Sequence, residues 1–119
     1  MLHDPKAYLY DIVKACDAII SYTKGMDNVG YLQDRMIQDA VERNFITIGE
    51  ALNRIKTEAP EISSQIVDSK KIIAFRNVVV HAYDMIESEV VWDVVQSEVE
   101  QLKGECQKLL RKRSEGDIT

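Results

Sequence analysis

Hydrophobic residues recur at steps of three and four along most of the chain, the spacing that places them on one face of an α-helix. The first such segment begins at Asp4-Pro5, a favourable N-cap and first-turn pair, and ends at Gly25. Its apolar face is formed by Leu9, Ile12, Val13, Cys16, Ile19, Ile20 and Thr23. The pattern predicts an amphipathic helix, followed by a short loop over residues 26–30.

A second periodic segment runs from Tyr31 to Glu58, and Ala59-Pro60 marks its end because the residue before a proline avoids the helical region. Its inner stripe consists of Ile37, Val41, Asn44, Ile48, Ala51, Leu52 and Ile55. Gly49 lies inside this predicted helix, where glycine costs about 1 kcal/mol relative to alanine. Two explanations stay open: the helix tolerates an unfavourable residue, or another helix, including one from a second subunit, approaches closely.

The remainder of the chain predicts two further helices. Residues 61–71 are polar enough for a loop with one turn of helix in it, and Asp68 or Ser69 caps the next helix. The β-branched residues of that helix also suit a strand, but a lone strand among helices has nothing to pair with. Ser88 caps the last helix, and the polar sequence after Leu110 is expected to fray. The apolar side of the last helix carries Val91, Val94, Val95, Glu98, Leu102, Cys106, Leu109 and Leu110.

Together these elements predict an all-α, up-down bundle of four to five helices with short connections. A chain of 119 residues suits one domain, which we assign to residues 1–113, with a polar tail over 114–119. No apolar stretch comes near the roughly 20 residues that a membrane-spanning helix needs, and the N-terminal residues lack the apolar region of a secretory signal. We therefore expect no membrane association.

The charge balance restricts the kind of partner. Fifteen Lys and Arg face twenty Asp and Glu, a net charge of −5, which argues against a protein that coats DNA through a broad basic face. Any contact with nucleic acid must come from a local basic site. Cys16 and Cys106 are far apart in the sequence and lack the spacing of metal ligands or redox pairs, which predicts a reduced, cytoplasmic protein with neither metal nor cofactor.

The candidate chemistry lies in the third helix, where Arg76 and Asn77 precede His81 and Tyr83. A histidine on an apolar helix is most often a satisfied core or interface residue, and that reading stays open for His81. Helix geometry separates Arg76 from His81 by about 140° around the axis and about 7.5 Å along it. The two side chains could act on one phosphate if the helix ends or bends near His81, or if two copies face each other across a twofold axis.

These residue types suit the cleavage of RNA. A neutral imidazole takes the proton of a 2′-hydroxyl or protonates a leaving oxygen near neutral pH. A guanidinium binds a phosphate through two N–H donors and stabilises charge in the transition state. Asn77 could orient the imidazole or contact the phosphate, and Tyr83 could stack on a base or donate a hydrogen bond. Lys70 and Lys71 could bind and steer the RNA backbone.

The pattern Arg76-x4-His81-x-Tyr83, with Asn77 after the arginine, resembles the signature of HepT-like HEPN ribonucleases. These are toxins paired with a small MNT-type nucleotidyltransferase antitoxin. The segments AVERNFITIGEALNRI (40–55) and VVWDVV (90–95) are also similar to that family's pattern. Glu50 within the first segment is either a solvated or interface carboxylate or a residue that assists the site.

The resemblance implies a homodimeric, metal-independent endoribonuclease, the toxin of a type VII-like toxin–antitoxin system. It assigns Arg76 and His81 to a catalytic centre at the dimer interface, and it makes Tyr83 the residue that the partner nucleotidyltransferase AMPylates to silence the toxin. The alternative is a noncatalytic helical module that binds and regulates a nucleotidyltransferase partner.

Overall fold

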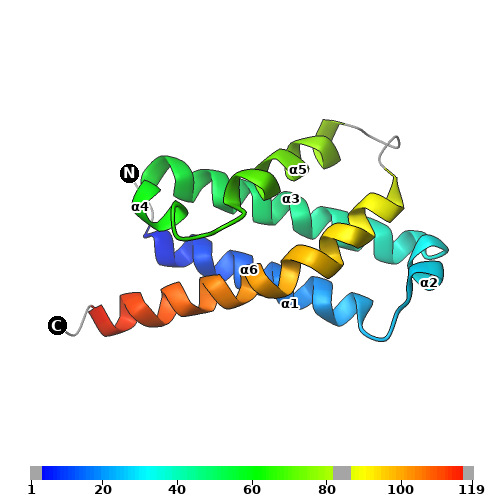
Figure 1. Ribbon diagram of the computed structural model, residues 1–119, viewed down its shortest axis with the longest axis horizontal. Helices are drawn as coiled ribbons and strands as arrows, with labels where there is room; N and C mark the ends of the chain where they lie inside the picture. The colour runs from blue at the N-terminus through cyan, green and yellow to red at the C-terminus, as the bar shows by residue number, and fades with distance from the viewer. Residues whose placement is uncertain (1–3, 82–86, 117–119) are drawn as a thin grey trace.

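The computed structural model describes residues 4–81 and 87–116, and every secondary-structure element within them is an α-helix. The elements are α1 (Pro5–Thr23), α2 (Asn28–Leu32), α3 (Arg35–Glu58), α4 (Pro60–Ser63), α5 (Ser69–His81) and α6 (Ser88–Gly116). The four long helices, α1, α3, α5 and α6, run in alternating directions (Figure 1). The prediction of an all-α, up-down bundle is confirmed. No helix of the described residues combines the length and hydropathy needed to cross a membrane.

The first helix begins and ends where local chemistry predicts. Asp4 is its N-cap, with a side-chain oxygen 2.9 Å from the backbone N–H of Lys6, and Pro5 occupies the first turn. The helix ends at Thr23, and the chain turns at Gly25, whose φ of 78° lies in the left-handed region that favours glycine.

The predicted helix over 31–58 is wrong at its N-terminal end, because the structure divides it into α2 and α3. Asp27 caps α2 by accepting from Gly30 N–H at 2.8 Å, so the expected loop over 26–30 is partly helical. Asp34 caps α3 by accepting from Ile37 N–H at 3.0 Å. The cap at Asp34 therefore interrupts a hydrophobic period that looks continuous.

Short helix α4 supplies the one helical turn expected between α3 and α5. At the other end of the chain, α6 continues to Gly116, beyond the fraying expected after Leu110. Arg113 Nη2 lies 3.4 Å from Asp4 Oδ1, which ties the last turns of α6 to the start of α1. The expectation of fraying rested on the polar sequence after Leu110, and a local sequence pattern cannot show a contact between the two ends of the chain.

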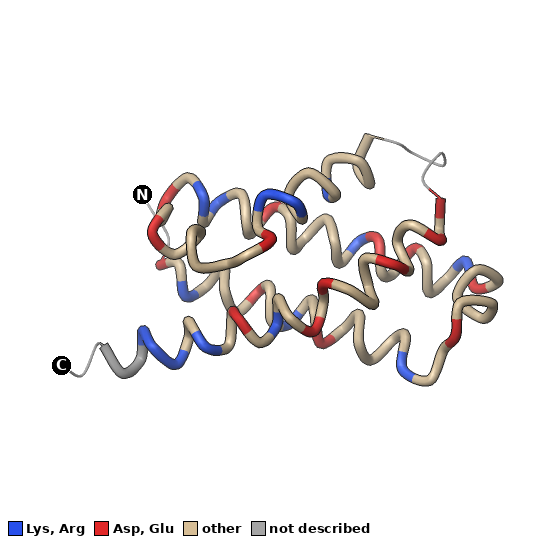
Figure 2. Tube along the Cα trace, viewed as in Figure 1, with Lys and Arg blue, Asp and Glu red and all other residues tan. Residues whose placement is uncertain are grey.

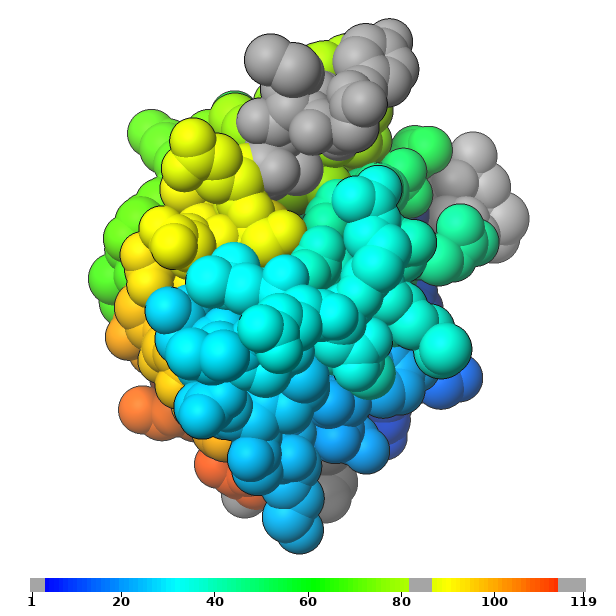
Figure 3. Space-filling view, turned by 90° about the vertical axis from the view of Figure 1, so that its right-hand side faces the viewer, coloured from blue at the N-terminus to red at the C-terminus, as the bar shows by residue number. Residues whose placement is uncertain are grey.

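The core lies between α1, α3 and α6, with α1 packed against both of the others. Its largest fully buried side chains are Tyr31, Phe45, Leu9, Ile12, Ile19, Ile48, Leu52, Ile55, Ile72, Val41, Val91 and Val99. The end of the bundle in Figure 3 is formed by α2, the last turns of α1 (blue) and the first turns of α3 and α6. There the Tyr31 and Trp92 rings pack with centroids 5.0 Å apart, which holds α2 against α6.

Helix α5 lies on the outer side of α3 (Figure 1), and α3 is its main packing partner. Only Ser69, Ile72 and Val79 of α5 are fully buried, and they share one side of the helix. After the paired lysines at its start, Arg76 is the one Lys, Arg, Asp or Glu of α5 (Figure 2). Beyond its first turn, α5 therefore carries a single permanent charge, that of Arg76.

Candidate functional site

Helix α5 presents the predicted site residues on its outer and lateral surfaces. His81 and Asn77 are exposed, and the Arg76 side chain retains 26% of its exposure. Val79, between them in sequence, points to the opposite side and is buried. Burial in the hydrophobic core, the most common role for a lone histidine on an apolar helix, is therefore excluded for His81.

Gly49 explains how Arg76 is seated. A Cβ built on Gly49 would overlap Cβ and Cγ of Arg76 and would lie 3.1 Å from its Cδ. Carbon atoms pack at about 3.5–4.0 Å, so only a glycine admits the arginine stem at this point of α3. Of the two explanations for Gly49, the structure supports close approach of another helix, and that helix is α5 of the same chain.

The guanidinium of Arg76 is held from both sides. Its Nη1 donates to Asn77 Oδ1 at 2.8 Å, and its Nη2 lies 3.4 Å from Glu50 Oε1. Its Nε is buried and has no hydrogen-bond partner among the described residues. Glu50 retains 60% of its exposure, so the ion pair is open to solvent and contributes little stability. Glu50 therefore stands beside the predicted catalytic arginine, and Asn77 contacts the guanidinium.

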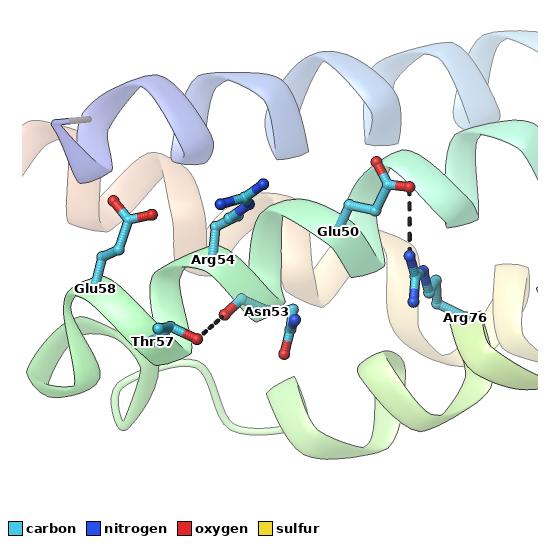
Figure 4. Close-up of a pocket in the computed structure, with 6 residues that line it drawn as sticks. All are labelled: Glu50, Asn53, Arg54, Thr57, Glu58 and Arg76. Carbon is cyan, nitrogen blue, oxygen red and sulfur yellow. Dashed lines mark hydrogen bonds and ion pairs between the residues drawn. The ribbon is translucent and has the colours of Figure 1, made fainter. Parts of the chain in front are cut away.

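A groove of about 420 Å³ opens beside this arginine (Figure 4). Its lining residues are Glu50, Asn53, Arg54, Thr57, Glu58 and Arg76. All but Arg76 come from α3, and Figure 4 shows the Glu50 and Arg76 side chains pointing toward one another from the two helices. The sequence interpretation missed Asn53 and Arg54, although their helical spacing from Glu50, opposite the inner stripe of α3, is a usable signal.

Arg76 and His81 do not meet within one chain. Helix α5 continues to His81, so the helical separation of about 140° and about 7.5 Å applies between them. The guanidinium turns toward α3, while the imidazole stands in solvent at the end of α5. Tyr83 lies outside the described residues, and the structure does not test its predicted place beside His81.

The two lysines at the start of α5 differ in their surroundings. Lys71 Nζ lies 2.8 Å from Glu98 Oε1 of α6, and that carboxylate side chain is only 6% exposed. The hydrogen bond to Glu98, together with its negative charge, raises the pKa of Lys71. Lys70 is exposed beside a second hollow on the α4–α5 side of the molecule. Lys71 thus has a structural partner, whereas Lys70 stays available to a ligand.

The described part of the chain gathers no cluster of three or more His, Cys, Asp or Glu that could hold a metal ion. What it offers instead is hydrogen-bond donation from a guanidinium, proton transfer by an exposed imidazole, and a polar groove that reaches the guanidinium. The first two groups match the needs of phosphodiester cleavage, in which charge develops on phosphate oxygens while protons move between ribose oxygens.

Comparison with known proteins gives consistent results. Residues 12–109 match the family described as Ribonuclease HepT-like. A candidate RNase of Methanocaldococcus jannaschii is 32% identical over 108 residues, which cover 91% of this chain and 92% of the relative. A protein of Thermococcus cleftensis named Probable ribonuclease HepT is 30% identical over 109 residues, which cover 92% of this chain and 98% of the relative. No solved structure matches significantly. With the family match spanning most of its length, the chain belongs to the HepT-like ribonucleases of the HEPN class.

Proposed function

We propose that this ribonuclease is a metal-independent endoribonuclease whose active form is a homodimer, with Arg76 and His81 as its catalytic residues. The observation that carries the proposal is the exposed imidazole at the end of α5, five residues from a guanidinium seated at the mouth of a groove. Because the two groups diverge within one chain, a second copy supplies the missing partner. Arg76 of one protomer then faces His81 of the other across a twofold axis.

The surface of α5 supports such an interface. Val78 is 51% exposed, and Ile73, Phe75 and Val80 are only half-buried, although α5 already packs on α3. Ile73 and Val80 share one side of α5, since seven residues make almost two full turns. Two copies of α5 paired along that side would remove both residues from water and bring both arginines into one cleft. The cleft gains its positive charge when the protomers associate, which agrees with the acidic charge of the single chain.

The chemistry follows from the two groups. One imidazole takes the proton of a 2′-hydroxyl while that oxygen forms a bond to phosphorus. The bond from phosphorus to the 5′-oxygen breaks, and the imidazolium formed in this way gives its proton to that leaving oxygen. The guanidinium donates N–H bonds to the non-bridging oxygens, where negative charge increases in the transition state.

The purified protein is expected to cut RNA in EDTA. Arg76→Ala and His81→Ala should each lower the rate by about 10²-fold or more while the helical circular dichroism and the dimer persist. His3→Ala removes the other histidine and should leave cutting unchanged. If unmodified protein, checked by mass spectrometry, cuts no RNA, the noncatalytic module that regulates a nucleotidyltransferase becomes the better interpretation.

Mixing the two inactive variants tests the shared site. A heterodimer of Arg76→Ala and His81→Ala retains one arginine and one histidine on different chains. If the protomers exchange freely, activity should recover to about one quarter of the wild-type value, since half of the dimers carry one intact pair. A mixture that forms heterodimers by native mass spectrometry yet stays inactive would contradict a site built across the interface.

We further propose that the protein is the toxin of a type VII-like toxin–antitoxin system, acting on cytoplasmic RNA. An MNT-type nucleotidyltransferase transfers AMP from ATP to the phenolic oxygen of Tyr83 and releases pyrophosphate. The added negative charge and bulk, two residues from His81, would oppose RNA binding.

ATP and the cognate partner should add one or more AMP masses at Tyr83, and Tyr83→Phe should remain toxic beside the partner. Tyr10→Phe, at a tyrosine that is 60% exposed, is the matched control.

A further inference from the structure

The groove on α3 has a residue whose charge nothing in the described chain neutralises by contact. Arg54 is exposed and makes neither a hydrogen bond nor an ion pair with any described residue. The side-chain amide of Asn53 is likewise exposed and without such a partner. By contrast, Arg35 and Arg113 form ion pairs with Asp39 and Asp4. The groove therefore has free donors beside the guanidinium of the catalytic arginine.

Each of the two carboxylates of the groove has one oxygen in a recorded contact, while Glu58 Oε1 is buried without a hydrogen-bond partner among the described residues. Glu50 pairs with Arg76, and Glu58 Oε2 accepts from the Tyr8 hydroxyl at 3.1 Å. Arg54 lies between them along α3, and Figure 4 shows its side chain on the same side of the helix as Glu50. An anion that enters the groove could thus bind Arg54 without first breaking a contact that the structure records for it.

The length of the groove fits a chain rather than a single phosphate. Glu50 and Glu58, at its two ends, are eight residues apart on α3, a distance of about 12 Å at 1.5 Å per residue. Arg76 lies at one end of the groove, so an RNA strand with one phosphodiester bound at Arg76 would extend past Asn53 and Arg54. A guanidinium binds a phosphate through a bidentate pair of N–H bonds, and an amide can bond to a sugar hydroxyl or a base edge.

We propose that the groove binds the nucleotide next to the scissile bond in a single-stranded RNA, with Arg54 on its phosphate and Asn53 on its sugar or base. This inference rests on the proposed function, because Arg76 defines which phosphate is the scissile one. Arg54 then determines substrate length: RNA that extends beyond the cleaved bond is bound more tightly than a dinucleotide, whose only phosphate is the scissile one.

Binding is measured in the His81→Ala background, so that the test does not depend on cleavage. Arg54→Ala should weaken the affinity for a fluorescent single-stranded RNA by about tenfold or more. It should also reduce the slope of log K against log salt by about 0.7, the value of one phosphate contact on a single strand. Arg54→Lys should recover part of the affinity, since it retains the charge without the planar fork. Arg111→Ala removes an exposed arginine of α6 and is the matched control.

The rate of RNA cleavage provides a second test of the subsite. The wild-type protein should have a higher kcat/KM for an extended oligonucleotide than for a dinucleotide, and Arg54→Ala should bring that ratio toward one. Unchanged RNA affinity and an unchanged ratio would overturn the subsite while leaving the proposed ribonuclease intact. Loss of the dimer in Arg54→Ala, by size-exclusion chromatography, would also overturn it, because the groove would then be a protein interface. If no RNA is cleaved at all, the proposed function fails, and the binding measurement then decides only whether the groove binds RNA through Arg54.

Discussion

The close contact between α3 and α5 can be tested with a pair of glycine substitutions. Gly49→Ala would place a methyl group where the stem of Arg76 lies, 3.1 Å from Cδ and in overlap with Cβ and Cγ. The Cγ and Cδ atoms can rotate away, but Cβ is fixed by the backbone of α5. The helices must therefore separate, and the arginine must move with α5.

The magnitude follows from two opposing effects. Alanine improves helix propensity by about 1 kcal/mol over glycine, whereas overpacking a tight contact costs about 1–3 kcal/mol. Gly104 isolates the first effect, because it is exposed on α6 and a Cβ there meets nothing within 4 Å. Gly104→Ala should stabilise the protein by up to about 1 kcal/mol, and the difference between the two variants should equal the packing cost of about 1–3 kcal/mol.

Thermal and urea denaturation at one protein concentration measure this difference. For 119 residues, 1 kcal/mol corresponds to about 4 °C in Tm, so Gly104→Ala should melt about 4–12 °C above Gly49→Ala. RNA cleavage should fall by about 10²-fold in Gly49→Ala, because a displacement of about 1 Å is enough to misplace a catalytic group. It should be unaffected in Gly104→Ala. If Gly49→Ala is as stable as Gly104→Ala and fully active, the seating of Arg76 against the glycine is refuted.

Two further predictions concern other parts of the molecule. Lys71→Ala should lower Tm, because Glu98 stays buried without its partner, whereas Lys70→Ala should leave Tm unchanged and weaken only RNA binding. The raised pKa of Lys71 means that its contribution is complete below the pKa of an unfolded lysine, about 10.4, and is lost as the pH rises through the folded value. Burial raises the pKa of the Cys16 and Cys106 thiols to about 12, so iodoacetamide at pH 8 should modify them rapidly only after urea unfolding; equal rates in both states would contradict their burial.

Elements of the fold that have local causes could be predicted from the amino-acid sequence alone. Hydrophobic period identified the long helices, and the aspartate and proline at the start of α1 set its boundary correctly, because a cap is formed by residues a few positions apart. The resemblance to the family rested on short segments of the sequence, residues 40–55, 76–83 and 90–95, and the family match over residues 12–109 confirms it. The same local method failed at Asp34, the cap at which α3 begins, because the hydrophobic period continues across it.

The way in which the helix faces meet could be read only from the packed structure. Gly49 is required because it packs against Arg76, which lies 27 positions later in the sequence. Lys71 forms an ion pair with Glu98 of α6, which lies 27 positions after the lysine. Likewise, the exposure of His81 and the groove that joins Arg54 to Arg76 depend on α5 packing outside α3. Periodicity shows which side of a helix is apolar, but it carries no information on which other helix covers that side or at what height. Those are set by the mutual packing of side chains distant in sequence.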